Sequence, residues 1–464
     1  MALPWLLAGC GLSAVPPAVP PLQLPLPPHF SGAIPPPRPP VDLSRYWSGF
    51  NDPELDRLVD EAVAQNYTIK AAGERIVAAA AAGGSATAAL LPDLTASGAT
   101  QESRLSSIGE PLEGGSTFQR TALASLYSFW TLPLFGRFTA THNGANAVLQ
   151  VATAERQAAQ VAVVAEVASA YIALRADQQQ QMSLQTELAA ARHIVDLVNI
   201  QAGAGIASEL DVARAQNHVD ELAFRLPAAK LAITTDILRL TALEGRFSPD
   251  PGLSTPKPLP AAPPPPAVVP ADLLRLRPQI IQAEAVVATN AANLGIANAN
   301  LYPQFALGGS LSLFNGASIL NPLTATNLPN TLTFFEAGPG LTIPLFDWWE
   351  HYDRARAAQA GLAASIQDYH AAVVDGVIDV DTALAGITAA HEEVLIAARE
   401  QQSAMRALNW AELLFSHGLT NLSDLLNVEQ EQEKADMDAT AAAAAVDNAT
   451  IKLYEAVGGG VLPH

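Results

Sequence analysis

The sequence predicts a mainly α-helical protein that also carries four strands of a membrane β-barrel and is built from two similar halves. Three observations support this prediction. The motif Thr-x-Pro-Leu-Phe occurs twice, with Pro133 and Pro344 211 positions apart. Two alanine-rich tracts, 134–226 and 345–462, contain no proline, as expected of long helices. A segment before the second tract alternates apolar and small polar residues with the period of a strand, and the segment before the first tract has a similar composition with a less regular alternation.

The repeat extends well beyond this motif. Pro92 and Pro303 are also 211 apart, whereas Gly205 in "GIASELDV" and Gly418 in "GLTNLSDL" are 213 apart. An offset that changes by only two residues over such a length indicates an internal duplication. We therefore expect a first repeat over 46–247 and a second over 271–464, joined by a proline-rich connector at 248–270.

Composition excludes several classes of protein. The chain has 464 residues and a formal net charge of -20, which argues against a nucleic-acid partner because phosphate contacts need clustered lysine and arginine. Only 15% of the residues are charged and 49% are hydrophobic, with much alanine among them. This composition favours long, closely packed helices.

The amino-terminal segment contains the single cysteine, Cys10, in the sequence "LLAGC". A lone cysteine allows no intrachain disulfide and no cysteine-based metal site. We interpret residues 1–10 as a truncated lipoprotein signal with Cys10 as the lipidation site; the alternative is a lone buried thiol. Residues 11–45 are expected to form a proline-rich tether.

Each half predicts the same order of elements. In the first, Asp52 and Pro53 are suited to begin a helix; a strand pair at about 93–132, a long helix, a tip turn at about 203–208 and a returning helix follow. Pro227 should bend or break that last helix. In the second half we expect a helix, a strand pair at about 304–345, a long helix, a tip turn at about 418–422 and a final helix.

The long helices and the strands each leave an alternative open. A helix of 65 to 70 residues would be about 100 Å long, and its small residues suit a broad barrel of helices, although an antiparallel coiled-coil rod has the same periodicity. The strands, about ten residues or slightly longer with aromatic residues near their ends, suit a membrane barrel, although two surface hairpins would also fit. Single-chain barrels begin at about eight strands. Four strands per chain therefore indicate a homo-oligomer, and three chains would supply twelve.

In this order, "LYSFWTLPLFGRF", "GIASELDVARAQ", "LLRLRPQIIQAEA", "GPGLTIPLFDWWEH" and "GLTNLSDLLNVEQ" resemble the bacterial outer-membrane efflux factors, the TolC and NodT type of channel. The resemblance implies a homotrimer with a twelve-stranded barrel in the outer membrane, continued by a periplasmic helical tunnel and anchored by lipid. It implies a passive, non-enzymatic and cofactor-free conduit for small molecules such as drugs, toxic compounds or metal ions. Its partners would be a periplasmic adaptor and an inner-membrane pump. The alternative is a periplasmic helical scaffold or adaptor that never enters the membrane.

The same resemblance implies a gate at the tip turns of Gly205 and Gly418. In the family the second-repeat tip carries an inward-facing aspartate and another three residues later; Asp424 matches the first position, whereas Asn427 occupies the second. Asp211 is the counterpart of Asp424 in the first repeat, and Arg214 is a candidate partner for these carboxylates. Both aspartates could instead simply cap the helices that follow the turns.

Where each strand pair ends, we expect Pro133 and Pro344 to mark the junction of barrel and tunnel, with Trp348 and Trp349 as interfacial anchors. "EHYD" at 350–353 is interpreted as a solvated helix face, so no metal site is expected. "GAGIAS" at 203–208 lacks the preceding strand of a dinucleotide site, and no G-x-S-x-G nucleophile motif occurs.

Overall fold

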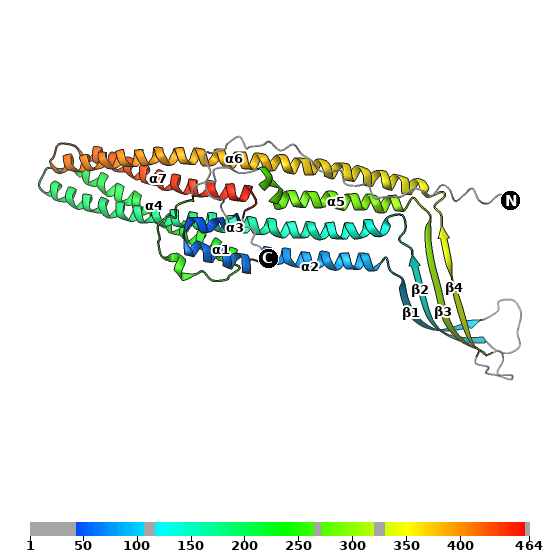
Figure 1. The fold of residues 1–464 in the computed structure, drawn as a ribbon. Coiled ribbons are helices and arrows are strands. Elements are labelled where there is room, and N and C mark those ends of the chain that lie inside the picture. Colours follow the sequence, from blue (N-terminus) through cyan, green and yellow to red (C-terminus); the bar gives the residue numbers. More distant parts are fainter. Residues whose placement is uncertain (1–42, 106–116, 264–270, 320–329, 460–464) are drawn as a thin grey trace. The chain divides into compact units, whose positions relative to one another are not determined.

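The computed structural model describes residues 43–105, 117–263, 271–319 and 330–459. The predictions for Cys10, for the tether at 11–42 and for the connector at 264–270 lie outside the described residues. In order (Figure 1), the elements are η1 (Leu43–Phe50), α1 (Pro53–Gln65), α2 (Tyr67–Ala88), β1 (Asp93–Leu105), β2 (Thr117–Thr131), α3 (Arg137–Gly203), α4 (Glu209–Leu243), η2 (Pro251–Ser254), η3 (Ala271–Leu276), α5 (Pro278–Ala299), β3 (Gln304–Ile319), β4 (Asn330–Thr342), α6 (Trp348–Ser416) and α7 (Leu422–Ala456). The labels η mark 3₁₀-helices.

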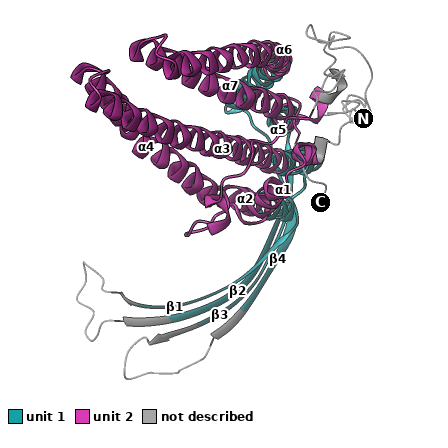
Figure 2. Ribbon diagram, turned by 90° about the vertical axis from the view of Figure 1, so that its left-hand side faces the viewer, with its two compact units in different colours: residues 1–23, 77–151, 283–369 teal, residues 24–76, 152–282, 370–464 magenta. Residues whose placement is uncertain are grey.

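The chain divides into two compact units, coloured separately in Figure 2. Of the described residues, unit 1 holds those in 77–151 and 283–369, with all four strands, and unit 2 holds the others. In unit 1 the strands form one antiparallel sheet in the order β1-β2-β3-β4. The central β2·β3 pair joins the first half of the sequence to the second, and its register places Leu126 opposite Leu311. The two halves therefore share one continuous sheet.

The sheet has two chemically different faces. Side chains alternate between the faces along each strand, so the register assigns each residue to a face. One face carries mainly apolar residues: Leu94, Ala96, Leu126, Leu307, Leu311 and Leu341. The other carries small and polar residues together with the aromatic residues Tyr127, Phe129 and Phe334. On this face the hydroxyls of Ser125 and Ser312 lie 2.9 Å apart. This difference is the one that the alternation in the second-half strand predicted.

Small residues bring the helices of unit 1 close together. A methyl group added to Gly83 of α2 would lie 3.2 Å from the Cβ of Ala145 in α3. One added to Gly144 of α3 would lie 3.1 Å from the Cβ of Ala292 in α5. Both distances are shorter than ordinary van der Waals contacts, so glycine is what allows this helix spacing.

The largest hydrophobic core lies in unit 2, where η1 and α1 cover α3, α4 and α7. It contains these fully buried large side chains: Trp47, Leu55, Leu58, Tyr171, Ile172, Leu174, Leu240, Leu253 and Tyr454. Asp52 caps α1, because its carboxylate accepts from the backbone N–H of Glu54 at 2.9 Å. The helix that Asp52 begins ends at Asn66. The Asn66 amide donates to the Leu243 carbonyl at 2.8 Å and its Oδ1 accepts from Thr68 N, which begins α2.

Helix α4 runs without interruption past Pro227, so a break at this residue, one of the two outcomes expected, does not occur. Proline at this position removes one backbone hydrogen bond. Packing on both sides of Pro227 compensates for this loss. Leu222 and Leu226 before it and Ala229 after it belong to one hydrophobic cluster with Leu184 and Leu188 of α3.

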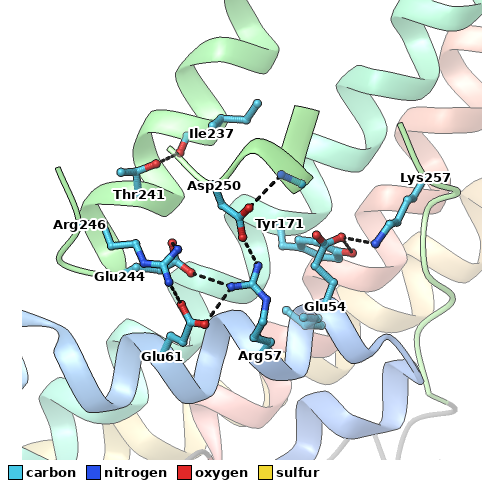
Figure 3. A network of polar contacts seen from close by, with 12 residues as sticks. Glu54, Arg57, Glu61, Tyr171, Ile237, Thr241, Glu244, Arg246, Asp250 and Lys257 are labelled. Atoms are coloured by element: carbon cyan, nitrogen blue, oxygen red, sulfur yellow. Dashed lines mark hydrogen bonds and ion pairs between the residues drawn. The ribbon is translucent and has the colours of Figure 1, made fainter. Parts of the chain in front are cut away.

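A polar network fastens the first part of the connector to α1 and α4 (Figure 3). Arg57 of α1 donates to Asp250 at 2.6 Å and to Glu61 at 3.0 Å, and Arg246 pairs with Glu61 at 2.7 Å. Glu244 lies between Arg57 and Arg246 with a fully buried side chain, but their nearest nitrogens are 3.8 and 3.9 Å away. The network thus includes one buried carboxylate without a hydrogen-bond partner.

Within the described ranges, one helix, α3, is long and apolar enough to cross a membrane by length and composition. Its most apolar 18-residue window has a mean hydropathy of 1.4, but 61% of that window is buried inside the structure. Such burial is what the core helix of a packed bundle shows.

Candidate gate at the helix turns

The first tip turn joins α3 to α4 and depends on Gly205. This residue has a φ of +70°, in the left-handed region that favours glycine. The N–H of Ile206 reaches back to the Gln201 carbonyl at 2.9 Å, and that of Gly205 to Ala202 at 2.9 Å, which satisfies the last carbonyls of α3. Ser208 then begins α4 as its N-cap.

The second tip turn, between α6 and α7, repeats this geometry. Gly418 has a φ of +69° and donates to the Phe415 carbonyl at 2.9 Å. Leu419 N donates to the Leu414 carbonyl at 2.9 Å, and Asn421 is the N-cap of α7. The two turns are therefore built alike 213 positions apart.

One hydrophobic cluster holds the two turns at the same end of unit 2. Its buried members come from all four helices that meet there: Val198, Ala215, Phe415, Leu422, Leu425 and Leu426. The structure thereby places Asp211 and Asp424 at one end of unit 2. Asp424, Asn427 and Arg214 are exposed, whereas Asp211 is half-buried.

Asp211 is engaged in a reciprocal cap. Its carboxylate accepts from the backbone N–H of Ser208 at 3.0 Å, and its own N–H donates to the Ser208 hydroxyl oxygen at 3.2 Å. Hydrogen bonds from Ser208, with a smaller contribution from the positive charge of Arg214, hold the pKa of Asp211 below its ordinary value. Arg214 itself forms no ion pair with any described residue.

Asp424 has the equivalent place in α7 but different partners. Its N–H donates to the Asn421 Oδ1 at 2.8 Å, while its carboxylate accepts from the Thr420 hydroxyl at 3.0 Å. Asn427 lies one turn further along α7. Because this carboxylate is exposed and not bound to the backbone at its N-cap, it remains able to face a cation or a second carboxylate.

The prediction that both aspartates might act as caps did not identify the capping residues themselves. Ser208 and Asn421 are the N-caps, and the aspartates stand three residues later, as the acidic partner of a capping box does. The signal was available in "SELD", since serine followed three residues later by an acid is the sequence mark of such a box. In "NLSD" asparagine takes the place of serine.

The junction residues lie between strand and helix in both halves. Pro133 follows the end of β2 at Thr131, and Pro344 follows the end of β4 at Thr342; the next helix begins four residues after each proline. Trp348 stacks on Tyr352 with ring centres 5.3 Å apart, and Trp349, 67% exposed, meets both rings edge-on. The two tryptophans thus form an aromatic cluster at the start of α6.

Over the residues described, no group of three or more histidine, cysteine, aspartate or glutamate side chains is placed to hold a metal ion. At 350–353, Glu350 pairs instead with Arg354, and Asp353 lies 3.8 Å from Arg356. These pairs follow helical spacing on an exposed face.

Comparison with known families decides the identity of the fold. The family model described as outer membrane efflux protein matches residues 58–246 and 269–459. The chain belongs to the outer membrane efflux protein family. The two matched segments begin 211 and end 213 positions apart, which are the offsets of the internal repeat.

Relatives of this efflux family protein cover nearly its whole length. Nodulation protein T of Rhizobium leguminosarum bv. trifolii is 28% identical over 432 residues, or 92% of this chain and 89% of the relative. The pyoverdine export outer membrane protein OpmQ of Pseudomonas aeruginosa is 27% identical over 430 residues, or 90% and 88%. These relatives support an outer-membrane location and a role as an efflux channel component, and they do not favour the scaffold alternative.

Solved structures share the fold. The outer-membrane channel OprN superposes with a TM-score of 0.78 at 25% identity, covering 94% of this chain and 95% of OprN. The open state of the MtrE outer membrane channel from Neisseria gonorrhoeae gives a TM-score of 0.78 at 22% identity, covering 95% and 96%. The predicted combination of long helices with a four-stranded sheet is thereby confirmed.

Proposed function

We propose that this efflux family protein forms a homotrimeric, twelve-stranded channel that passively releases small molecules from the cell. An inner-membrane pump and a periplasmic adaptor would deliver the cargo, and the tip turns would form the gate. Relatives are named for pyoverdine export and for toluene efflux. Small organic molecules are therefore the first cargo class to test, with metal ions second. We further propose that Cys10 is acylated and anchors the channel, and that Trp348 and Trp349 lie at the membrane interface.

The observation that carries the proposal is the open sheet. Within the described chain, β1 and β4 each pair on one side only. A free edge presents unpaired N–H and C=O groups, which cannot remain unpaired in the hydrocarbon of a membrane. Four strands are fewer than the eight or so that close the smallest barrels. Three copies would supply twelve strands and leave no edge.

The proposed gate rests on the position of Asp424. In a trimer, three copies of this exposed carboxylate would surround the axis at the tip, with Asn427 in place of a second acidic ring. Like charges at one aperture repel one another and attract cations. Cations entering from the periplasmic side would therefore bind at this ring. The exposed apolar side chains of Ile206 and Leu419 at the same turns offer a surface for the adaptor.

Single-channel recording in planar bilayers tests the gate. We expect Asp424→Ala to raise the conductance and to weaken block by divalent cations. Asn421→Ala, which removes the cap of α7 but keeps the carboxylate, should leave the block unchanged. If Asp424→Ala alters neither conductance nor block, Asp424 is not part of the gate. Recovery of the wild-type chain as a soluble monomer would contradict the channel itself.

A further inference from the structure

Helices α4 and α7 contact each other directly, and each belongs to one of the two helical hairpins that end in the tip turns. Arg225 of α4 forms an ion pair with Glu433 of α7, and its Nη2 donates to the Met437 sulfur at 3.0 Å. Nearer the turns, His218 of α4 faces Glu429 of α7. Two polar pairs therefore cross the boundary between the hairpins.

The His218–Glu429 pair is buried but poorly matched. Its side chains are 8% and 13% exposed, and the imidazole Nε2 lies 3.6 Å from Glu429 Oε2, which is too far for a hydrogen bond. Among the described residues, neither Glu429 Oε2 nor His218 Nδ1 has a hydrogen-bond partner. Burying such groups without partners costs free energy, which water would restore if the helices parted.

The surroundings keep this pair from becoming an ion pair at neutral pH. Burial lowers the pKa of His218, an effect that Glu221 partly opposes and Arg225 strengthens. Burial, and then the negative charge of Glu412, raises the pKa of Glu429 to about 7. The charged groups around the two polar pairs come from all four helices: Glu221 and Arg225 of α4, Glu412 of α6, Glu433 of α7 and Glu187 of α3. Above pH 7 the contact is thus a carboxylate that faces an uncharged imidazole.

We propose that His218 and Glu429 form a pH-sensitive weak point between the two helical hairpins, at which α4 separates from α7 more readily once Glu429 has lost its proton. Arg225, in the neighbouring pair, stays charged throughout this range. His218 lies about two helical turns from Asp211, so separation of α4 from α7 at this point would move the tip turns. The weak point lies within one chain, and only its consequence for conduction rests on the proposed function.

The direction of the pH effect follows from the number of protons bound. Between the ordinary glutamate value of about 4.3 and about 7, Glu429 holds a proton while α4 and α7 are packed and loses it when they part. The packed state therefore weakens as the pH rises through this range, by about tenfold per pH unit, and the full penalty is present above about 7. Glu429→Gln keeps the size of the side chain but not the charge, so it removes this penalty.

Hydrogen exchange of the detergent-solubilised full-length protein, corrected for the intrinsic pH dependence of exchange, tests the proposal. We expect the amides of 215–222 and 425–433 to be better protected in Glu429→Gln than in wild type. The ratio of the two protection factors should grow by about tenfold per pH unit between pH 5 and 7 and then level off. The ratio isolates Glu429 because other buried carboxylates, such as Glu244 and Asp447, titrate alike in both proteins. A ratio that stays constant from pH 5 to 8.5, both here and in Glu429→Met, would overturn the proposal.

Glu433→Gln, one helical turn further along α7, is the matched control. It leaves Arg225 without its carboxylate partner, so it should lower the protection of the same amides, the opposite of Glu429→Gln. Equal gains from both variants would show that any loss of negative charge at this boundary has the effect, and would overturn the role of the His218–Glu429 pair.

Planar bilayers test the consequence for conduction. Wild type should conduct more at pH 8.5 than at pH 6, and Glu429→Gln should lack this rise. The expected protection ratio without any difference in conduction would overturn the link to the gate alone. Because protection can be measured whether or not the chain forms a channel, a failure of the proposed function would be seen separately.

Discussion

Ser208 and Asp211 cap each other at the start of α4, each accepting a hydrogen bond from the backbone N–H of the other. At the start of α7 only half of this arrangement is present. Asn421 accepts from Asp424 N, but the Asp424 carboxylate accepts from Thr420 and not from the N-cap backbone. The two equivalent aspartates therefore differ: Asp211 caps its turn, whereas the Asp424 carboxylate is not bound to the N-cap backbone and is the one that we assign to the proposed gate.

This difference predicts that Asp211→Ala affects the stability of its turn, whereas Asp424→Ala affects conductance. Asp211→Ala should cost the first turn about 1 kcal/mol, so the amides of 208–212 should exchange hydrogen several-fold faster while conductance changes little. The low pKa of Asp211 adds a pH dependence. The carboxylate's contribution is complete above the ordinary aspartate pKa of about 3.9, and it is lost as the pH falls through the lowered value. Exchange rates that Asp211→Ala leaves unchanged at pH 7 would contradict the capping role.

Two glycines at the tip turns, one from each turn, can be compared. Gly418 has a φ of +69°, so Gly418→Ala should cost about 1–2 kcal/mol in backbone strain. Gly203, at the end of α3, has no such φ, and a Cβ there meets nothing within 4 Å. Gly203→Ala should therefore be neutral or slightly stabilising. Thermal unfolding of the detergent-solubilised protein, followed by circular dichroism, measures both. Equal effects of the two substitutions would show that the positive φ is not what the turn requires.

The internal repeat predicted those parts of the fold that the two halves share. The equivalence of Gly205 with Gly418, and of Pro133 with Pro344, follows from local backbone chemistry that a repeat conserves. Two features depend on distant partners. Asn66 ends α1 by donating to the Leu243 carbonyl, and α4 continues past Pro227, whose neighbours pack on α3. Neither partner can be found from the spacing of residues along one helix.

The buried carboxylate of Glu244 predicts a pH-dependent stability. Burial raises its pKa to about 7, an effect that Arg246 and Arg57 only partly oppose. Between the ordinary glutamate value of about 4.3 and about 7, the folded protein holds a proton that the unfolded chain has lost, so stability falls as the pH rises across this range. We expect Glu244→Gln to raise the melting temperature at pH 8 and to leave it nearly unchanged at pH 4.5.

Asp250, in the same network, serves as the control because its pKa is shifted in the opposite direction from that of Glu244. The backbone N–H of Gly252 and then the charge of Arg57 lower its pKa, so its ionised form stabilises the fold at neutral pH. Asp250→Asn should therefore lower the melting temperature at pH 8, by an amount that shrinks as the pH falls below about 4. If Glu244→Gln also lowers the melting temperature at pH 8, the pairing with Arg57 and Arg246 outweighs the cost of burial.

Phe135 and Phe346 occupy equivalent positions but should fail in different ways when truncated. Phe135 stacks on Tyr302 within its own chain, so Phe135→Ala should destabilise the subunit itself by about 3 kcal/mol or less, since the ring is only partly buried. Phe346, 211 positions after Phe135, is 97% exposed, so Phe346→Ala should leave the single chain intact and weaken only the contact between subunits of the proposed trimer. Native mass spectrometry over a dilution series, with circular dichroism on the same samples, separates these outcomes. We expect the trimer of Phe346→Ala to dissociate at several-fold higher protein concentration than wild type, with helical content unchanged. Dissociation equal to that of wild type would mean that Phe346 does not contribute to the contact between subunits.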